Sequence, residues 1–218
     1  MKISSRIAFV ALTCMALQGV TAPVQAGQKN DVANPVSVNI KVTQTEAALR
    51  DLWLGHGFWV RNVVLATLSG DSAAAAAAEK EAISNAKQIA ASIEPFYGKD
   101  ASEKFFTLLG GHYLAIKQYL DATVARSGDK QVAASKAMVA NGGDIAAFLS
   151  NANPNLPFEV LRGSLMAHGG HHMQQIQQLS SKNYEQEAQT WEAMKTHMYG
   201  ISAALTAGLA KQFPAKFI

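Results

Sequence analysis

Apolar residues between Leu49 and Val64 recur at the spacing of one face of an α-helix. The positions on this face are Leu49, Leu52, Trp53, His56, Val60 and Val63. Intervals of three and four residues indicate an amphipathic helix, because 3.6 residues make one helical turn. Thr45 is a suitable N-cap, and the turn sequence Ser-Gly-Asp at 69–71 ends the pattern. The pattern therefore predicts a helix from Thr45 to the turn at 69–71.

The same pattern returns twice at one fixed interval, which we call the repeat interval. It is the separation along the chain between His56 and His112, and again between His112 and His168. The apolar positions around each histidine match, and the second half of each unit matches in the same register, for example at Ile89 and Ile145. A fixed period with matches in both halves indicates an internal repeat. We predict three copies of one unit, at residues 43–98, 99–154 and 155–210.

Each unit has the pattern of two helices joined by a turn. In the first unit, Ser72 opens an alanine-rich segment of strong helix formers that runs to a break at Pro95 and Gly98. We therefore predict an all-α fold, a helical bundle of three repeated antiparallel helical hairpins, with six helices in one domain at residues 45–218. Residues 27–44 contain Pro35 and several β-branched residues, so we predict an extended N-terminal arm there.

Residues 1–26 have the features of a secretory signal peptide. Lys2 and Arg6 precede an apolar run, and the run is followed by Val24-Gln25-Ala26, with small residues where a signal peptidase cuts. Cleavage would leave 218 − 26 = 192 residues and would remove Cys14, the single cysteine, so no disulfide is expected. We predict an exported protein, either periplasmic or extracellular.

Charge and hydropathy narrow the class of partner. The formal net charge of +3 falls to +1 once Lys2 and Arg6 are removed, which argues against nucleic acid as a partner. The longest apolar stretch after residue 26, at 52–68, is interrupted by polar residues and is short for a bilayer span. We therefore predict no integral membrane segment after signal cleavage. The arm at residues 28–42 is a candidate site for a protein partner.

Histidines and asparagines fall at one height in the predicted hairpins. The pairs at this height are, from the first unit to the third, His56 with Asn85, His112 with Asn141, and His168 with His197. In the first unit both side chains are 14 or 15 residues from Gly70, which is roughly 21–22 Å at the helical rise of about 1.5 Å per residue. His172 follows His168 by one turn on the same face, whereas His171 points elsewhere.

Polar groups at a buried level must find partners, because an unpaired one costs about 1–3 kcal/mol. Neutral imidazoles meet this need by binding a metal ion, and an all-nitrogen set favours zinc or copper. Two histidines at positions i and i+4 of a helix have chelating spacing. The candidate metal ligands are His56, His112, His168, His172 and His197.

Two other interpretations stay open. In the first, the protein is a non-catalytic structural or interaction protein whose buried side chains form a hydrogen-bonded layer that fixes the register of the hairpins. That layer would pair His56 with Asn85 and His112 with Asn141. In the second, the polar level holds a small ligand or a non-covalent haem, with haem less favoured. The additional histidines of the third unit favour a metal ion, because a layer does not require them.

Other polar residues near this level are candidates for supporting the ligands: Asn85, Asn141, Arg61 and Asp144. A charge in an apolar stretch is normally paired, so we predict an ion pair between Arg61 and Asp144.

No motif supports catalysis, since the chain has no Gly-x-Ser-x-Gly, no Glu-x-x-His and no cysteine after residue 26.

Three segments of the chain resemble a group of secreted bacterial six-helix proteins. These segments are Leu52 to Asn62, Asn141 to Pro154 and Lys211 to Phe217. The likeness extends over most of the chain after residue 26. It implies a six-helix fold and export, and it brings no activity with it. The segment at 169–178, with its added histidines, departs from the pattern of that group.

Overall fold

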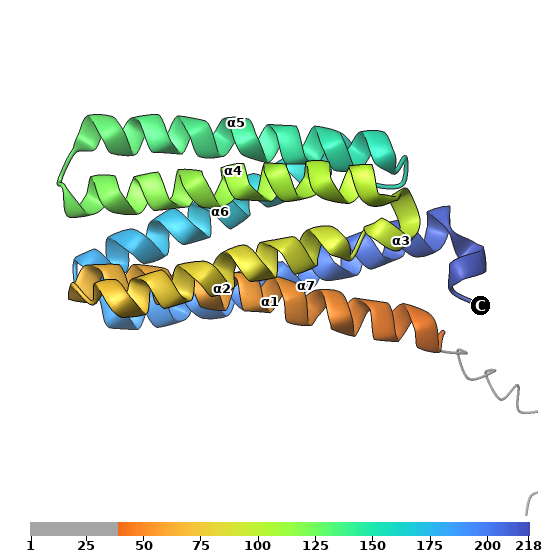
Figure 1. The fold of residues 1–218 in the computed structure, drawn as a ribbon, viewed down its shortest axis with the longest axis horizontal. Helices are drawn as coiled ribbons and strands as arrows, with labels where there is room; N and C mark the ends of the chain where they lie inside the picture. The colour runs from red at the N-terminus through yellow and green to blue at the C-terminus, as the bar shows by residue number, and fades with distance from the viewer. Residues whose placement is uncertain (1–38) are drawn as a thin grey trace, which may run out of the picture. The chain divides into compact units, whose positions relative to one another are not determined.

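The computed structural model describes residues 39–218 of the chain. The predicted signal peptide and residues 27–38 of the predicted arm lie outside the described residues. The described part is helical (Figure 1), and none of its helices is both long enough and apolar enough to cross a membrane. The helices are α1 (Ile40–Ser69), α2 (Ser72–Ala91), α3 (Glu94–Tyr97), α4 (Lys99–Val124), α5 (Gly128–Ala152), α6 (Phe158–Ser180), α7 (Tyr184–Gln212) and the 3-10 helix η1 (Pro214–Lys216).

Six long helices form three antiparallel hairpins, as predicted: α1 with α2, α4 with α5, and α6 with α7. Each hairpin turn contains one residue in the left-handed region, namely Gly70 (φ 77°), Arg126 (φ 53°) or Lys182 (φ 59°). A left-handed residue at the end of a helix reverses the chain and satisfies the last carbonyl groups of the helix. The three residues succeed one another at the repeat interval of the sequence pattern.

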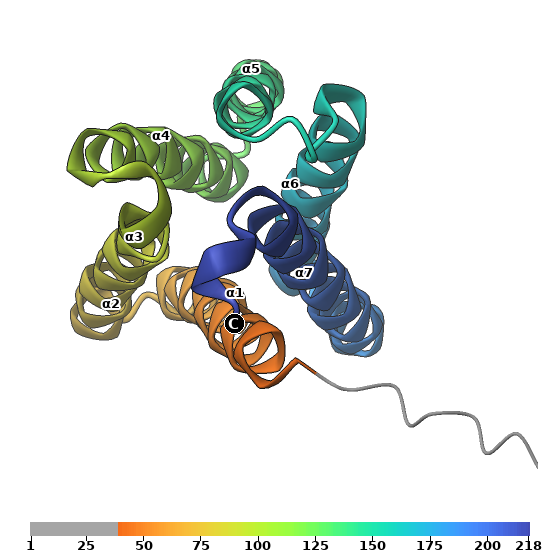
Figure 2. The same ribbon diagram turned by 90° about the vertical axis from the view of Figure 1, so that its right-hand side faces the viewer.

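The three hairpins pack around a common centre, which Figure 2 shows along the bundle. The first helices of the hairpins, α1, α4 and α6, contact one another. The second helices fill the spaces between them, with α2 against α1 and α4, α5 against α4 and α6, and α7 against α6 and α1. Side chains on the inner faces of the first helices therefore meet at the centre of the bundle.

Two apolar clusters make up the core of the bundle. One contains Trp53, Phe105 and Leu165, and the other lies nearer the hairpin turns and contains Val60 and Ile116. In each hairpin, the histidine that recurs at the repeat interval falls between the two clusters along its helix. The fold therefore places a polar level between two apolar layers.

The predicted arm is shorter than expected, because α1 begins at Ile40 and includes residues 40–44. Asn39, in place of the predicted Thr45, caps the helix, and its side-chain oxygen accepts a hydrogen bond from the Val42 amide. The side-chain nitrogen of Asn39 donates to the carbonyl of Phe217 over 2.6 Å. Val42 also packs against the core. These tertiary contacts stabilise an additional turn of helix that local sequence did not indicate.

Candidate metal centre

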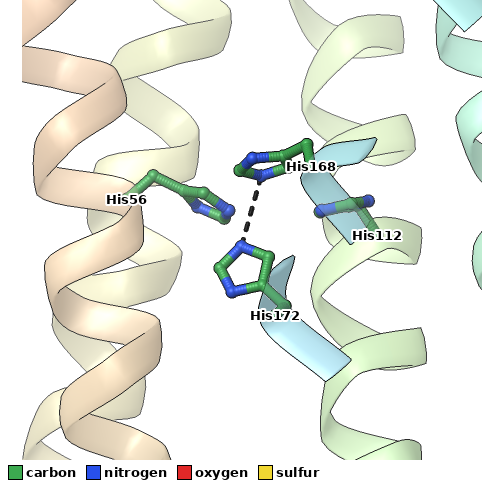
Figure 3. Close-up of side chains that lie close together, drawn as sticks. All are labelled: His56, His112, His168 and His172. Carbon is green, nitrogen blue, oxygen red and sulfur yellow. Dashed lines mark hydrogen bonds between the residues drawn. The ribbon is translucent and has the colours of Figure 1, made fainter. Parts of the chain in front are cut away.

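Four histidines meet at the centre of the bundle, and we call them the four-histidine group: His56, His112, His168 and His172. They come from all three first helices, one from α1, one from α4 and two from α6 (Figure 3). Their side chains converge from opposite sides of the bundle centre. All four are buried, with exposed fractions between 1% and 4%. Four of the five predicted ligands are thus together in one place.

The ring nitrogens of the group are close enough for one ion. One nitrogen from each ring lies within 4.8 Å of the corresponding nitrogens of the other three. Ring centroids within the group are between 4.6 and 6.1 Å apart. The Nε2 atoms of His168 and His172 are 3.2 Å apart, close to the edge of about 3.3–3.4 Å of a tetrahedron with zinc–nitrogen bonds of about 2.0–2.1 Å.

Four of the eight ring nitrogens in the four-histidine group are buried and have no hydrogen-bond partner within residues 39–218. These atoms are Nε2 of His56, both ring nitrogens of His112, and Nδ1 of His168. Between His168 and His172 the two Nε2 atoms form a hydrogen bond, in which one ring donates and the other accepts. Each unpaired buried polar atom costs about 1–3 kcal/mol. Ring nitrogens that converge without partners are suited to a shared ligand that accepts their lone pairs.

Burial lowers the pKa of every histidine in the group. It lowers the pKa of His56 to about 3, with a further contribution from His112, and the pKa of His112 to about 4 against an opposing contact with Asn141. Burial, and then the neighbouring imidazoles, hold the pKa values of His168 and His172 well below the ordinary value. At neutral pH the four rings are therefore uncharged, which is the form that binds metal ions.

Apolar side chains enclose the group along the bundle. The ring of Trp53 stands edge-on to His56 and His168, with centroids 6.4 and 6.2 Å away. On the side of the turns, Val60 and Ile116 each lie four residues beyond a histidine of the group and are almost completely buried. The low polarity of these surroundings strengthens electrostatic interactions with anything bound at the centre.

The asparagines do not pair with histidines through ordinary hydrogen bonds, as a hydrogen-bonded layer would require. Asn85 Nδ2 instead donates to the carbonyl of Leu52 over 3.0 Å, and Asn141 Nδ2 donates to the carbonyl of Leu108 over 2.9 Å. Each bond links the two helices of one hairpin. The Oδ1 atoms of both asparagines are buried and have no partner in the described part of the chain.

A glycine beside the histidine allows each asparagine to approach. A Cβ atom added at Gly55 would lie 2.9 Å from Asn85 Nδ2, and one at Gly111 would lie 2.9 Å from Asn141 Nδ2. The glycine, the amide and the carbonyl thus form the same local structure in the first two hairpins. Our sequence interpretation missed these two glycines, although each directly precedes a repeated histidine and the repeat interval separates them.

The expectation for His197 needs correction, because this residue lies outside the four-histidine group. Its Nε2 is 2.9 Å from the carbonyl oxygen of Ser164 and bridges the third hairpin as the asparagines bridge the other two. The ring is stacked with that of His168 at a centroid distance of 6.2 Å. His171 is half-buried and outside the group, as its position on the helix predicted.

The predicted ion pair between Arg61 and Asp144 is wrong. Arg61 makes two 2.6 Å hydrogen bonds to the carboxylate of Glu187, and Gln175 donates a third, of 2.9 Å. Burial raises the pKa of Glu187, but these hydrogen bonds outweigh it and leave the pKa below its ordinary value. Asp144 is exposed on α5. The spacing along the chain placed both residues near the polar level without showing that they face different directions.

Comparison of the chain with protein-family models, with curated proteins and with solved structures found no match. The interpretation of the site therefore depends on its geometry and chemistry.

Proposed function

We propose that the protein is an exported metal-binding helical bundle in which the four-histidine group holds one metal ion. The observation that supports it is the convergence of four uncharged, buried imidazoles, four of whose eight ring nitrogens have no hydrogen-bond partner in the described residues. One ion bound to four lone pairs would relieve several unpaired polar atoms at once. The proposal of export depends on the features of residues 1–26.

Zinc or copper is the ion that this set of donors favours. The group offers four imidazole nitrogens and contains no carboxylate, within the residues that the structure describes. Calcium and magnesium prefer oxygen ligands, whereas imidazole suits zinc and copper. With no anionic ligand, the bound site would retain the full charge of the ion, so the interaction depends on nitrogen–metal bonds.

The same geometry favours a resident ion with a structural role over a catalytic ion. Four side-chain ligands complete a tetrahedron, whereas catalytic zinc sites keep one position for water or substrate. The four histidines are almost completely buried, so substrate has no direct approach. An ion at this level would join α1, α4 and α6, one helix from each hairpin.

The arrangement gives less support to the alternatives. The amide groups of Asn85 and Asn141 are committed to backbone carbonyls, whereas a layer would pair them with histidines. A porphyrin bound through two opposite histidines would use only two of the four converging rings. The proposed protein partner of residues 28–42 concerns a segment that lies mostly outside the described residues.

Metal analysis of protein prepared without a histidine tag tests the proposal. We expect about one equivalent of zinc or copper per chain, or stoichiometric uptake of cobalt(II) with the visible absorption of a tetrahedral complex. A variant with both His112→Ala and His168→Ala should retain no stoichiometric metal. Circular dichroism of the same samples checks that the variant is folded. Equal and near-zero metal in both folded proteins would exclude the proposal.

A further inference from the structure

Two histidines outside the four-histidine group connect it to the surface of the bundle. His171 on α6 and His197 on α7 are both half-buried, and their ring centroids are 5.6 Å apart. His197 is in turn stacked with His168, a member of the group, at 6.2 Å and an interplanar angle of 17°. Three imidazoles thus follow one another from partly exposed positions to the centre.

Hydrogen bonding leaves one nitrogen of His197 free to bind a metal ion. The carbonyl oxygen of Ser164 can only accept, so the contact of 2.9 Å requires that His197 Nε2 carries a proton and donates it. In the neutral ring the proton is then on Nε2, and Nδ1 has the lone pair. At the inner end, His168 Nδ1 is buried and has no partner within residues 39–218.

The other two hairpins have no such series of imidazoles. The positions that correspond to His197 are Asn85 and Asn141, whose amide nitrogens are used in hydrogen bonds to backbone carbonyls. The position that corresponds to His171 one repeat interval earlier is Ala115, and two intervals earlier it is Trp59. Metal-binding side chains therefore extend outward from the group at the third hairpin.

We infer that His171 and His197 form a surface acquisition site, which binds a transition-metal ion and passes it through His168 to the four-histidine group. This inference rests on the proposed function, because it assumes that the group holds an ion. The buried group needs such a route, since its ligands are hardly exposed and a functional metal site requires a way in.

Transfer proceeds by exchange of one imidazole for another. An ion held by His171 and His197 gains His168 as an additional ligand when the ring of His168 turns outward, and it loses His171 as it moves inward. Each step replaces one nitrogen–metal bond with another, so the ion never depends on an apolar environment alone. No redox change and no covalent intermediate is involved.

Rates of metal exchange test this inference, with cobalt(II) as the probe and the full chain as the protein. The test variant combines His171→Gln with His197→Asn and Ala167→Gly. Asparagine with a glycine at 167 copies the hydrogen-bonded arrangement of the first two hairpins, where a Cβ atom at the corresponding position would lie 2.9 Å from the amide. The variant therefore keeps the link within the hairpin and loses both outer imidazoles.

We expect uptake and release to slow together by about tenfold or more, equivalent to at least about 1.4 kcal/mol of added barrier. Stoichiometry and equilibrium affinity should stay unchanged, because all four resident ligands are retained. Uptake is followed by visible absorption after mixing, and release is followed after addition of excess chelator. Measurement of both rates distinguishes a route from a ligand, because loss of a ligand changes the affinity.

Asp51→Asn is the matched control, since it alters a different approach to the same level. A surface groove lined by Asp51, Asn85 and Gln88 lies over Gly55, next to His56. We expect this variant to exchange cobalt at the wild-type rate. Three results would each overturn the inference while leaving the proposed function intact. These are slower exchange in Asp51→Asn alone, unchanged rates in the triple variant, and a lower affinity in the triple variant. Failure of the wild-type protein to bind cobalt would overturn both.

Discussion

Individual residues at the polar level differ in chemistry although they are neighbours along the chain. His171 and His172 are adjacent on α6, but only His172 belongs to the four-histidine group. The helix turns by about 100° per residue, so one ring meets the other histidines and the next is half-buried near His197. Substitution of His172 therefore tests the metal site, and the same substitution of His171 is its control.

His172→Ala should weaken metal binding by more than the roughly 10–100-fold that loss of an outer hydrogen-bond partner of a metal ligand costs. The physical reason is the loss of one of four nitrogen donors and of the contact with His168. Competition with a chelator of known affinity measures the change. His171→Ala should leave the equilibrium affinity unchanged, and equal losses in the two variants would contradict the assignment of His172 as a ligand.

Arg61→Met should lower the free energy of unfolding by about 2–3 kcal/mol, since removal of the partly exposed guanidinium leaves the buried carboxylate of Glu187 without its counter-charge. The carboxylate of Glu187 is 2% exposed and would keep only its hydrogen bond from Gln175. Urea denaturation measures the change. Lys117→Met is the comparison, because it removes the more exposed pair with Asp121 and should cost less than about 1 kcal/mol. Similar losses of unfolding free energy in the two variants would show that water reaches the carboxylate of Glu187.

The sequence was sufficient to predict which residues share a height, but not which way they face. The repeat interval and the i, i+4 spacing correctly brought together His56, His112, His168 and His172. Counting from the turns also placed His197 and Asp144 near this level. Their directions depend on how the second helices of the hairpins are rotated against the first, which is set by packing and is not visible in chain spacing.

At the scale of the helices, small residues determine how closely the two members of a hairpin approach. Gly110 and Gly111 are adjacent on α4, yet an added Cβ atom would contact Asn141 only at Gly111. Glycine is otherwise unfavourable in a helix, by about 1 kcal/mol relative to alanine. The presence of glycine at 111 is thus explained by the amide beside it.

Substitution by alanine should therefore have opposite effects at these two positions. Gly110→Ala should raise the free energy of unfolding by about 0.5–1 kcal/mol through helix propensity. Gly111→Ala should lower it by about 1 kcal/mol, because displacement of Asn141 leaves buried polar groups unpaired and this outweighs the gain in propensity. Thermal and urea denaturation of the two variants measure the difference. If both alanine variants are more stable than the wild-type protein, the Asn141 side chain can move aside without losing its hydrogen bond.

Helices and turns were largely predictable because local signals mark them. The first two hairpin turns contain serine, glycine and aspartate, the third is Ser180-Ser181-Lys182-Asn183, and the left-handed residues of the three turns succeed one another at the repeat interval. The start of α1 was missed, since Asn39 caps the helix while its amide also contacts Phe217 at the far end of the chain. The internal repeat itself stays a prediction. The recurring turns and hydrogen bonds of the hairpins agree with it.

For the whole molecule, the buried histidines predict that the metal-free protein loses stability in acid. Unfolded histidines bind protons as the pH falls below about 6.5, whereas the folded-state pKa values of His56 and His112 are about 3 and about 4. Between these values the unfolded state binds more protons. The free energy of unfolding should therefore fall with decreasing pH, by at most roughly 1.4 kcal/mol per pH unit for each histidine.

Urea denaturation with chelator present, at several pH values between 7.5 and 5, measures this slope. His112→Leu removes one of the four histidines of the group and replaces it with an apolar side chain of similar size. Its slope should be shallower than that of the wild-type protein by the contribution of one histidine. A free energy of unfolding that does not change over this range would mean that the four rings are already accessible to protons in the folded protein.

The contact between Asn39 and Phe217 has a consequence for the order of the hairpins. It joins the beginning of α1 to the segment after η1, so three hairpins succeed one another in a closed circle and none of them is first in space. A circular permutant that connects residue 218 to residue 39 through a short linker, and opens the chain between α3 and α4, keeps every hairpin whole and should assemble the same interior, since chain ends that lie close together tolerate such rearrangement. A designer would then have to keep each hairpin whole, but could change the order of the hairpins along the chain.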